Sequence, residues 1–174
     1  MIFIVCVSAS LYQIHPYRIV MQTQYSPKQK GIVMKYRAEC SCGSVVVEVN
    51  NEPFQQILCH CTNCRAWSAS PVTSATLFKP EDVKITAGKE LIQRYEQNEG
   101  HAKCWCSKCG GHLMNDHTVG YGFIDVYGAL LQDFEFTPTA HINYENAILR
   151  MRDGLPKFKD FPTEFGGSGE MLEE

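Results

Sequence analysis

The sequence predicts a mainly β domain of antiparallel strands with little helix, built around clustered cysteines. Short runs of β-branched and aromatic residues recur between turn residues, which is typical of antiparallel sheets. Eight of the nine cysteines lie in three tight groups, within residues 40–42, 59–64 and 104–109. With 174 residues, 44% of them hydrophobic, the chain is long enough for one domain with a core and too short for two of typical size.

The chain divides into three parts by composition. Residues 1–33 are expected to be a poorly ordered N-terminal extension, because residues 22–30 have the polar composition of a linker. The cysteine-rich β domain is expected to occupy residues 34–152. Residues 153–174 contain Pro156, Pro162 and a glycine-rich stretch, so we expect an irregular C-terminal tail, packed partly by its phenylalanines at 158, 161 and 165. Cys6 lies in the extension and is not expected to bind a metal.

Strands are expected at residues 45–49, 74–78, 83–86, 91–95, 103–106, 112–114 and 123–127, where β-branched and aromatic residues concentrate. Helix is expected only as short turns at 62–70 and 80–83, the second because Pro80 suits a first helical position.

The charge and hydropathy of the sequence argue against nucleic acid and membranes as binding partners. A net charge of -3 and a pI near 6.1 give no basic surface for nucleic acid or anionic membrane. The apolar piece at residues 2–7 is far shorter than the roughly 20 residues of a membrane span. It also lacks the positively charged start of a signal peptide. We therefore expect a cytoplasmic protein with small-molecule or protein partners, and both a monomer and a homodimer remain open.

Paired cysteines two residues apart suit a shared metal ion. In an extended segment, residues i and i+2 point to the same face, so Cys40 and Cys42 can bind one ion together. The sequence C-S-K-C-G at 106–110 has the form of a zinc knuckle, whose final glycine permits a positive φ, and Gly43 follows Cys42 in the same way. Two such half-sites would form one structural zinc site with four thiolates. Adjacent C-x-C pairs do not suit a disulfide framework, so a reduced compartment is favoured.

The middle group supplies three sulfurs within six residues, from Cys59, Cys61 and Cys64, with His60 directed elsewhere. Three protein ligands and a free fourth position are typical of catalytic zinc. Cys104 leaves an alternative open, because its sulfur would complete a second four-thiolate site. In that case the protein supplies all four ligands of both metal ions, and the chain is a non-catalytic structural or protein-interaction module.

Three motifs carry a resemblance to a known family: C-S-C-G at 40–43, C-H-C-T-N-C-R at 59–65, and W-C-S-K-C-G at 105–110. In this order they resemble the glutathione-dependent formaldehyde-activating enzyme family, which shares its domain with centromere protein V, over roughly residues 34–149. The resemblance implies an Mss4-like, or β-tent, fold. It also implies two zinc ions per chain: a structural one held by Cys40, Cys42, Cys106 and Cys109, and a catalytic one held by Cys59, Cys61 and Cys64.

The implied reaction is the addition of glutathione to formaldehyde, which in reverse is that of a carbon–sulfur lyase. The chain departs from the family pattern at Lys103, where an arginine is usual, and at residues 147–148, where a tryptophan is common. The family pattern leaves Cys104 out of both metal sites.

Two residues of the middle motif are the leading catalytic candidates. His60 lies inside the motif and could transfer a proton. Arg65 could offset the charge of three thiolates or bind a glutathione carboxylate. Weaker candidates for proton transfer are His112, His117, His141, Asp125 and Tyr127. The first interpretation is therefore a lyase that adds glutathione or a related thiol to formaldehyde or a similar small aldehyde.

Overall fold

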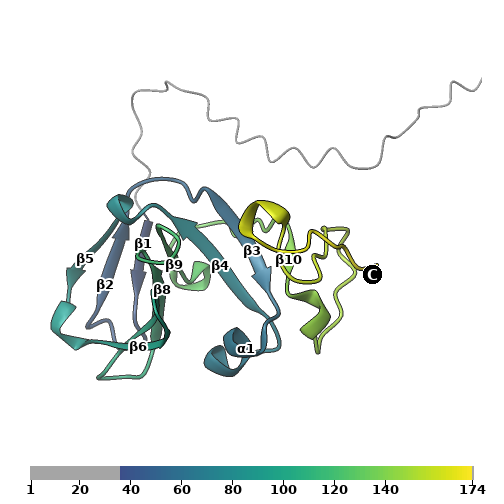
Figure 1. Cartoon of the computed structure of the whole chain (residues 1–174). Helices are drawn as coiled ribbons and strands as arrows, with labels where there is room; N and C mark the ends of the chain where they lie inside the picture. Colours follow the sequence, from purple (N-terminus) through teal and green to yellow (C-terminus); the bar gives the residue numbers. More distant parts are fainter. Residues whose placement is uncertain (1–35, 174) are drawn as a thin grey trace, which may run out of the picture. The chain divides into compact units, whose positions relative to one another are not determined.

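The computed structural model describes residues 36–173, and it consists of two β-sheets with one short α-helix (Figure 1). A three-stranded sheet has the order β1-β2-β5, and a seven-stranded sheet has the order β10-β3-β4-β9-β8-β7-β6. All neighbouring strands pair antiparallel except β10, which runs parallel to β3. The prediction of a mainly β, antiparallel fold with little helix is confirmed.

The strands are short, and the chain passes between the two sheets several times. They are β1 (Tyr36–Glu39), β2 (Val46–Val49), β3 (Gln55–Cys59), β4 (Thr73–Phe78), β5 (Val83–Ala87), β6 (Ile92–Asn98), β7 (His101–Cys106), β8 (His112–His117), β9 (Phe123–Val126) and β10 (His141–Ile142). The helical segments are α1 (Thr62–Ser68) and the 3-10 turns η1 (Pro80–Asp82), η2 (Lys89–Leu91), η3 (Gly128–Leu130), η4 (Tyr144–Asn146) and η5 (Thr163–Phe165).

The hydrophobic core joins the two sheets. Val47 and Val49 of β2 contribute to it from the small sheet, and Phe78, Leu113 and Val126 from β4, β8 and β9 of the large one; all five are fully buried. β-Branched valines suit this position because they pack well on a pleated surface. The core thereby fixes β1 and β2 relative to β7 and β8.

Buried and half-buried side chains alternate along β7, and this alternation positions residues of the site. Ala102, Cys104 and Cys106 are buried, whereas His101, Lys103 and Trp105 are half-buried. Because side chains on a strand point alternately to opposite faces, the second set lies on the face away from the core.

Most predicted elements are present, and three strands are not among the predicted ones. The short turn of helix at 62–70 is α1, and the proline turn is η1. The predicted strands do not include β1, β3 or β10, because the four-residue β1, the polar start of β3 and the two-residue β10 give little periodic signal. Cys6 and the expected boundary between residues 33 and 34 lie outside the described residues.

The C-terminal segment packs beside β10 of the large sheet, where Lys157 forms a bridge with His141. Phe158 is buried and its N–H donates to the carbonyl of His141, whereas Phe161 and Phe165 remain 40% and 46% exposed. Across residues 36–173, no helix has the length and apolar character that a bilayer crossing requires.

We expect Phe78→Ala to lower the free energy of unfolding by about 3–5 kcal/mol, because it empties a fully buried site at the junction of the sheets. Phe165→Ala is the matched control and should cost about 1 kcal/mol or less, since nearly half of its side chain is already in water. Urea denaturation of the metal-loaded proteins measures both. Equal losses would show that the core does not lie where the two sheets meet.

Candidate metal centre

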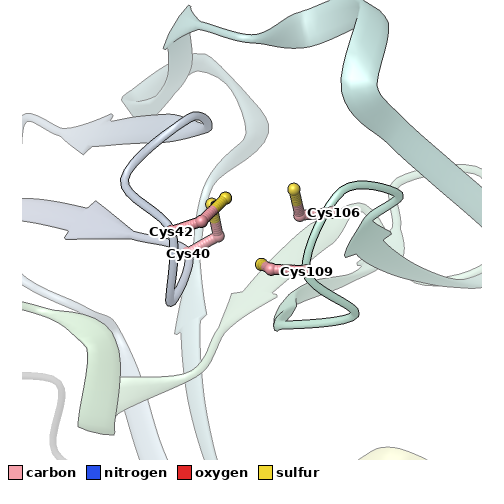
Figure 2. Close-up of side chains that lie close together, drawn as sticks. All are labelled: Cys40, Cys42, Cys106 and Cys109. Atoms are coloured by element: carbon pink, nitrogen blue, oxygen red, sulfur yellow. The ribbon is translucent and has the colours of Figure 1, made fainter.

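Four cysteines from two separate loops converge at one place. Cys40 and Cys42 lie in the turn between β1 and β2, and Cys106 and Cys109 lie at the turn between β7 and β8 (Figure 2). Their four Sγ atoms all lie within 4.8 Å of one another. We call these residues the four-cysteine group; their arrangement can hold a metal ion.

Both turns rely on a glycine and on donors to sulfur. Gly43 has φ 68° and its N–H donates to the carbonyl of Cys40 at 2.8 Å, while Gly110 has φ 72° and donates to the carbonyl of Cys106 at 2.8 Å. Positive φ values favour glycine because a Cβ atom would be strained there. Backbone N–H groups of Val45 and Gly111 donate to the sulfurs of Cys40 and Cys109. The predicted role of both glycines is confirmed.

The three-cysteine group consists of Cys59, Cys61 and Cys64, whose Sγ atoms also lie within 4.8 Å of one another. Cys59 ends β3, Cys61 is the N-cap of α1, and Cys64 lies in the first turn of the helix. The N–H of Cys64 donates to the Sγ of Cys61 at 3.2 Å. The helix start thus brings the third sulfur beside the first two.

Negative charge is favoured at one sulfur of this group. Hydrogen bonds from the thiols of Cys59 and Cys64 hold the pKa of Cys61 far below its usual range. The hydrogen bond that Cys59 donates to Cys61 in turn raises the pKa of Cys59, together with its burial. Such a set of sulfurs can exchange protons for a cation, as metal binding by cysteine requires.

His60 lies between two of these cysteines and points the other way. Its side chain is fully buried, and its ring Nε2 lies 2.8 Å from Nδ1 of His141. Its carbonyl accepts a hydrogen bond of 3.0 Å from Nε of Arg65. The predicted orientation of Cys59 and Cys61 away from His60 is therefore present in the structure.

The three-cysteine group opens onto a cavity of about 600 Å³. All three cysteines line the cavity, whereas none of the four-cysteine group does. Apolar side chains from β3, β4, β9 and the C-terminal segment form much of its wall, among them Ile57, Leu77 and Phe123. This group therefore has room beside it for a small molecule.

Cys104 belongs to neither group. It lies in the hydrophobic core, 1% exposed, where burial raises the pKa of its thiol to about 11. On β7 it faces the opposite side from Lys103, which lines the cavity together with the three-cysteine group. The alternative in which Cys104 closes the second site therefore lacks its fourth sulfur in this structure.

Lys103 places a positive charge at the cavity. Its Nζ lies 5.3 Å from the ring centroid of Trp67, a cation–π contact. The Nζ makes no hydrogen bond or ion pair with any residue that the structure describes. The signal that could have found it is the alternation of β7, which puts residues 101 and 103 on the face opposite to Cys104.

Other titratable groups line the same cavity. Asp125 is buried, and it accepts hydrogen bonds of 2.8 Å from the N–H of Thr76 and from Nδ2 of Asn115. Burial raises its pKa to about 6. His117 lies with its Nδ1 3.1 Å from Nδ1 of His101, and burial lowers the pKa of His117 to about 4.

The remaining candidates from the sequence lie elsewhere. Five of these candidates do not line the cavity: His60, Arg65, His112, His141 and Tyr127. His112 stacks on Trp67 with ring centroids 4.3 Å apart, and the hydroxyl of Tyr127 donates to Oδ1 of Asn115 at 3.3 Å. Of the histidines predicted for proton transfer, the cavity contains only His117.

Comparison with known proteins identifies a family and two similar proteins. The model of the family described as glutathione-dependent formaldehyde-activating enzyme matches residues 35–146. A protein of Schizosaccharomyces pombe (strain 972 / ATCC 24843), described as an uncharacterized lyase, is 24% identical over 86 residues; the match spans 49% of this chain and 61% of that protein. A crystal structure of a Rhodobacter sphaeroides protein is 22% identical, with a TM-score of 0.48, over 59% of this chain and 91% of that one.

We expect two metal ions per chain by elemental analysis, and Cys104→Ala should retain both because Cys104 belongs to neither group. Cys61→Ser should lose one ion while the helix start is kept, because serine is also a favourable N-cap. Loss of one ion from Cys104→Ala would show that this sulfur is a ligand after all.

Proposed function

The chain belongs to the glutathione-dependent formaldehyde-activating enzyme family, and on that premise we propose that it is a zinc-dependent carbon–sulfur lyase acting at the three-cysteine group. The observation that carries this proposal is the difference between the two sulfur groups. One has four sulfurs and lies apart from the cavity, whereas the other has three sulfurs and lines a cavity of about 600 Å³.

Both groups fit zinc. Zinc prefers tetrahedral sites with sulfur at about 2.3 Å, which places ligand sulfurs about 3.8 Å apart. Groups whose sulfurs all lie within 4.8 Å of one another need only a small contraction to reach this geometry. We propose that the four-cysteine group, Cys40, Cys42, Cys106 and Cys109, holds a structural ion. We propose that Cys59, Cys61 and Cys64 hold the catalytic one.

In the proposed reaction, the sulfur of glutathione or a related thiol bonds to the carbonyl carbon of formaldehyde or a similar small aldehyde. The proton of the thiol ends on the carbonyl oxygen, so nothing is oxidised or reduced. A bound zinc ion would lower the pKa of the thiol and hold the substrate as its thiolate. The chain's own contribution is to place both substrates in one cavity and to limit the access of water.

The excess negative charge of three thiolates would disfavour an anionic substrate at such a site. The positive charge of Lys103 can offset it. Three thiolates exceed the charge of one zinc ion, so a further anionic substrate is repelled. The ammonium of Lys103 lines the same cavity, and among the described residues it has a cation–π contact with Trp67 but no hydrogen-bond or ion-pair partner. We propose that it binds a carboxylate of the thiol substrate and offsets this repulsion.

Proton transfer is assigned to residues that reach the cavity. Asp125 and His117 both line it, and we propose that one of them passes the proton to the carbonyl oxygen. Catalytic roles for His60 and Arg65 remain predictions. Their contacts support an indirect role, because Arg65 holds the carbonyl of His60 and His60 lies between two cysteines. Reduced thiolates and a glutathione substrate both suit the cytoplasm, which we propose as the location.

Formaldehyde consumption by the zinc-loaded protein should depend on glutathione, and Cys61→Ser should lose this activity to the level of the uncatalysed reaction. Cys104→Ala is the control and should keep it. The measurement is the loss of free formaldehyde with and without glutathione, corrected for their spontaneous reaction. Consumption that does not respond to the thiol would rule out the proposed reaction.

Lys103→Met should raise the KM for glutathione about 10- to 100-fold, the effect of losing a hydrogen bond between charged groups. The variant should also lose any preference for glutathione over its diethyl ester, whose carboxylates are masked. Lys84→Met, on the exposed part of β5, is the matched control and should behave as the unchanged protein. A retained preference in Lys103→Met would exclude this lysine as the carboxylate-binding residue.

A further inference from the structure

A chain of hydrogen-bonded side chains connects the C-terminal segment to the three-cysteine group. Nε2 of His60 lies 2.8 Å from Nδ1 of His141, and Nε2 of His141 lies 2.9 Å from Oδ2 of Asp153. The other carboxylate oxygen of Asp153 accepts a hydrogen bond of 2.7 Å from Nζ of Lys157. We call His60, His141 and Asp153 the histidine chain.

The histidine chain is shielded from water along most of its length. Both histidines are fully buried, and the ring of Tyr144 packs edge-on against them with centroids 4.8 Å and 5.4 Å away. Lys157 is also buried. Buried hydrogen bonds of this kind fix ring orientations, because breaking one leaves a polar group without water.

The carboxylate sets the direction of the hydrogen bonds. Hydrogen bonds from Lys157 and His141 help to keep the pKa of Asp153 well below its usual range against the opposing effect of burial, so the group is an acceptor. His141 must then carry a proton on Nε2. In the tautomer in which Nδ1 of His141 accepts from Nε2–H of His60, the orientation of the His60 ring follows from Asp153 two links away.

The histidine chain acts on a residue whose neighbours are the sulfurs. The N–H of His60 donates to the carbonyl of Ile142 at 3.0 Å, and its carbonyl accepts from Arg65. Hydrogen bonds thus hold the backbone N–H, the carbonyl and the ring Nε2 of His60. Because Cys59 and Cys61 flank it and point to the opposite face, fixing His60 also fixes the direction of both sulfurs.

We propose that Asp153 and His141 are positioning residues for the metal ion of the three-cysteine group, acting through His60. This inference rests on the proposed function, since it assumes a metal ion there. It also goes beyond the family match, which ends at residue 146 and so does not include Asp153 or Lys157. The C-terminal segment is then part of the metal site, although it supplies no ligand.

The test compares variants that cut the chain at different links. His141→Phe removes the link to His60 and leaves the Asp153–Lys157 ion pair in place, whereas Lys157→Met breaks the ion pair and leaves the histidines linked. Asp153→Asn removes the charge that orients both. Asp160→Asn is the control, because this carboxylate lies in the same segment and, among the described residues, its hydrogen bonds are to residues 161 and 168.

The readout is the rate at which the zinc-loaded proteins release metal to excess 4-(2-pyridylazo)resorcinol. Cys61→Ser identifies the phase that belongs to the three-cysteine group, because only the other phase should remain. We expect His141→Phe and Asp153→Asn to speed the three-cysteine phase about 10- to 100-fold, as is usual for residues that support metal ligands, with the other phase unchanged. Lys157→Met and Asp160→Asn should leave both phases near their original rates.

Each outcome separates this inference from the proposed function. Unchanged release from His141→Phe and Asp153→Asn, in proteins whose circular dichroism shows them folded, would overturn the positioning role and leave the lyase proposal intact. Faster release from these variants, in a protein without glutathione-dependent formaldehyde consumption, would support the positioning role and overturn the lyase. An unaltered chain in which the three-cysteine group binds no metal ion, so that Cys61→Ser loses none, would overturn both.

Discussion

The geometry of the three-cysteine group depends on the alternation of side chains around His60. On an extended segment, one residue cannot share a face with its two neighbours, so burying the His60 ring turns Cys59 and Cys61 together toward the cavity. The start of α1 then adds Cys64, with a backbone N–H on the sulfur of Cys61. A single buried ring and one helical turn are enough to bring three sulfurs together.

The two sulfur groups differ in how they are supported. The four-cysteine group ties the turn after β1 to the turn after β7, and the hydrophobic core beneath it contains Cys40 and Cys106 themselves. A metal ion there would stabilise the junction of the two sheets, which in a small domain is worth much of the folding energy. The three-cysteine group comes from one short stretch of chain and adds little to that junction. Its place is at a cavity, which suits chemistry better than stability.

The cavity combines features that the family match alone does not describe. Lys103 adds an ammonium, Asp125 adds a buried carboxylate, and Phe161 and Phe165 contribute to the lining from beyond the matched residues. The histidine chain likewise draws on the segment after residue 146. The C-terminal part of this chain therefore reaches both the cavity and the histidine chain from beyond the residues that the family match covers.

Sequence alone was sufficient for the class of fold and for the separate cysteine half-sites, because both depend on local spacing. Which half-sites come together depends on contacts between distant parts of the chain. Residues two apart on a strand, and a glycine after a C-x-x-C turn, carry their geometry with them. The positions of Cys104, Lys103 and Asp153 were decided only by tertiary structure. Which face of β7 meets the core depends on the packing of β1 and β2. The contact between His60 and His141 depends on the parallel pairing of β10 with β3, and the contact between His141 and Asp153 depends on the bridge between His141 and Lys157. None of these pairings leaves a periodic signal in the sequence.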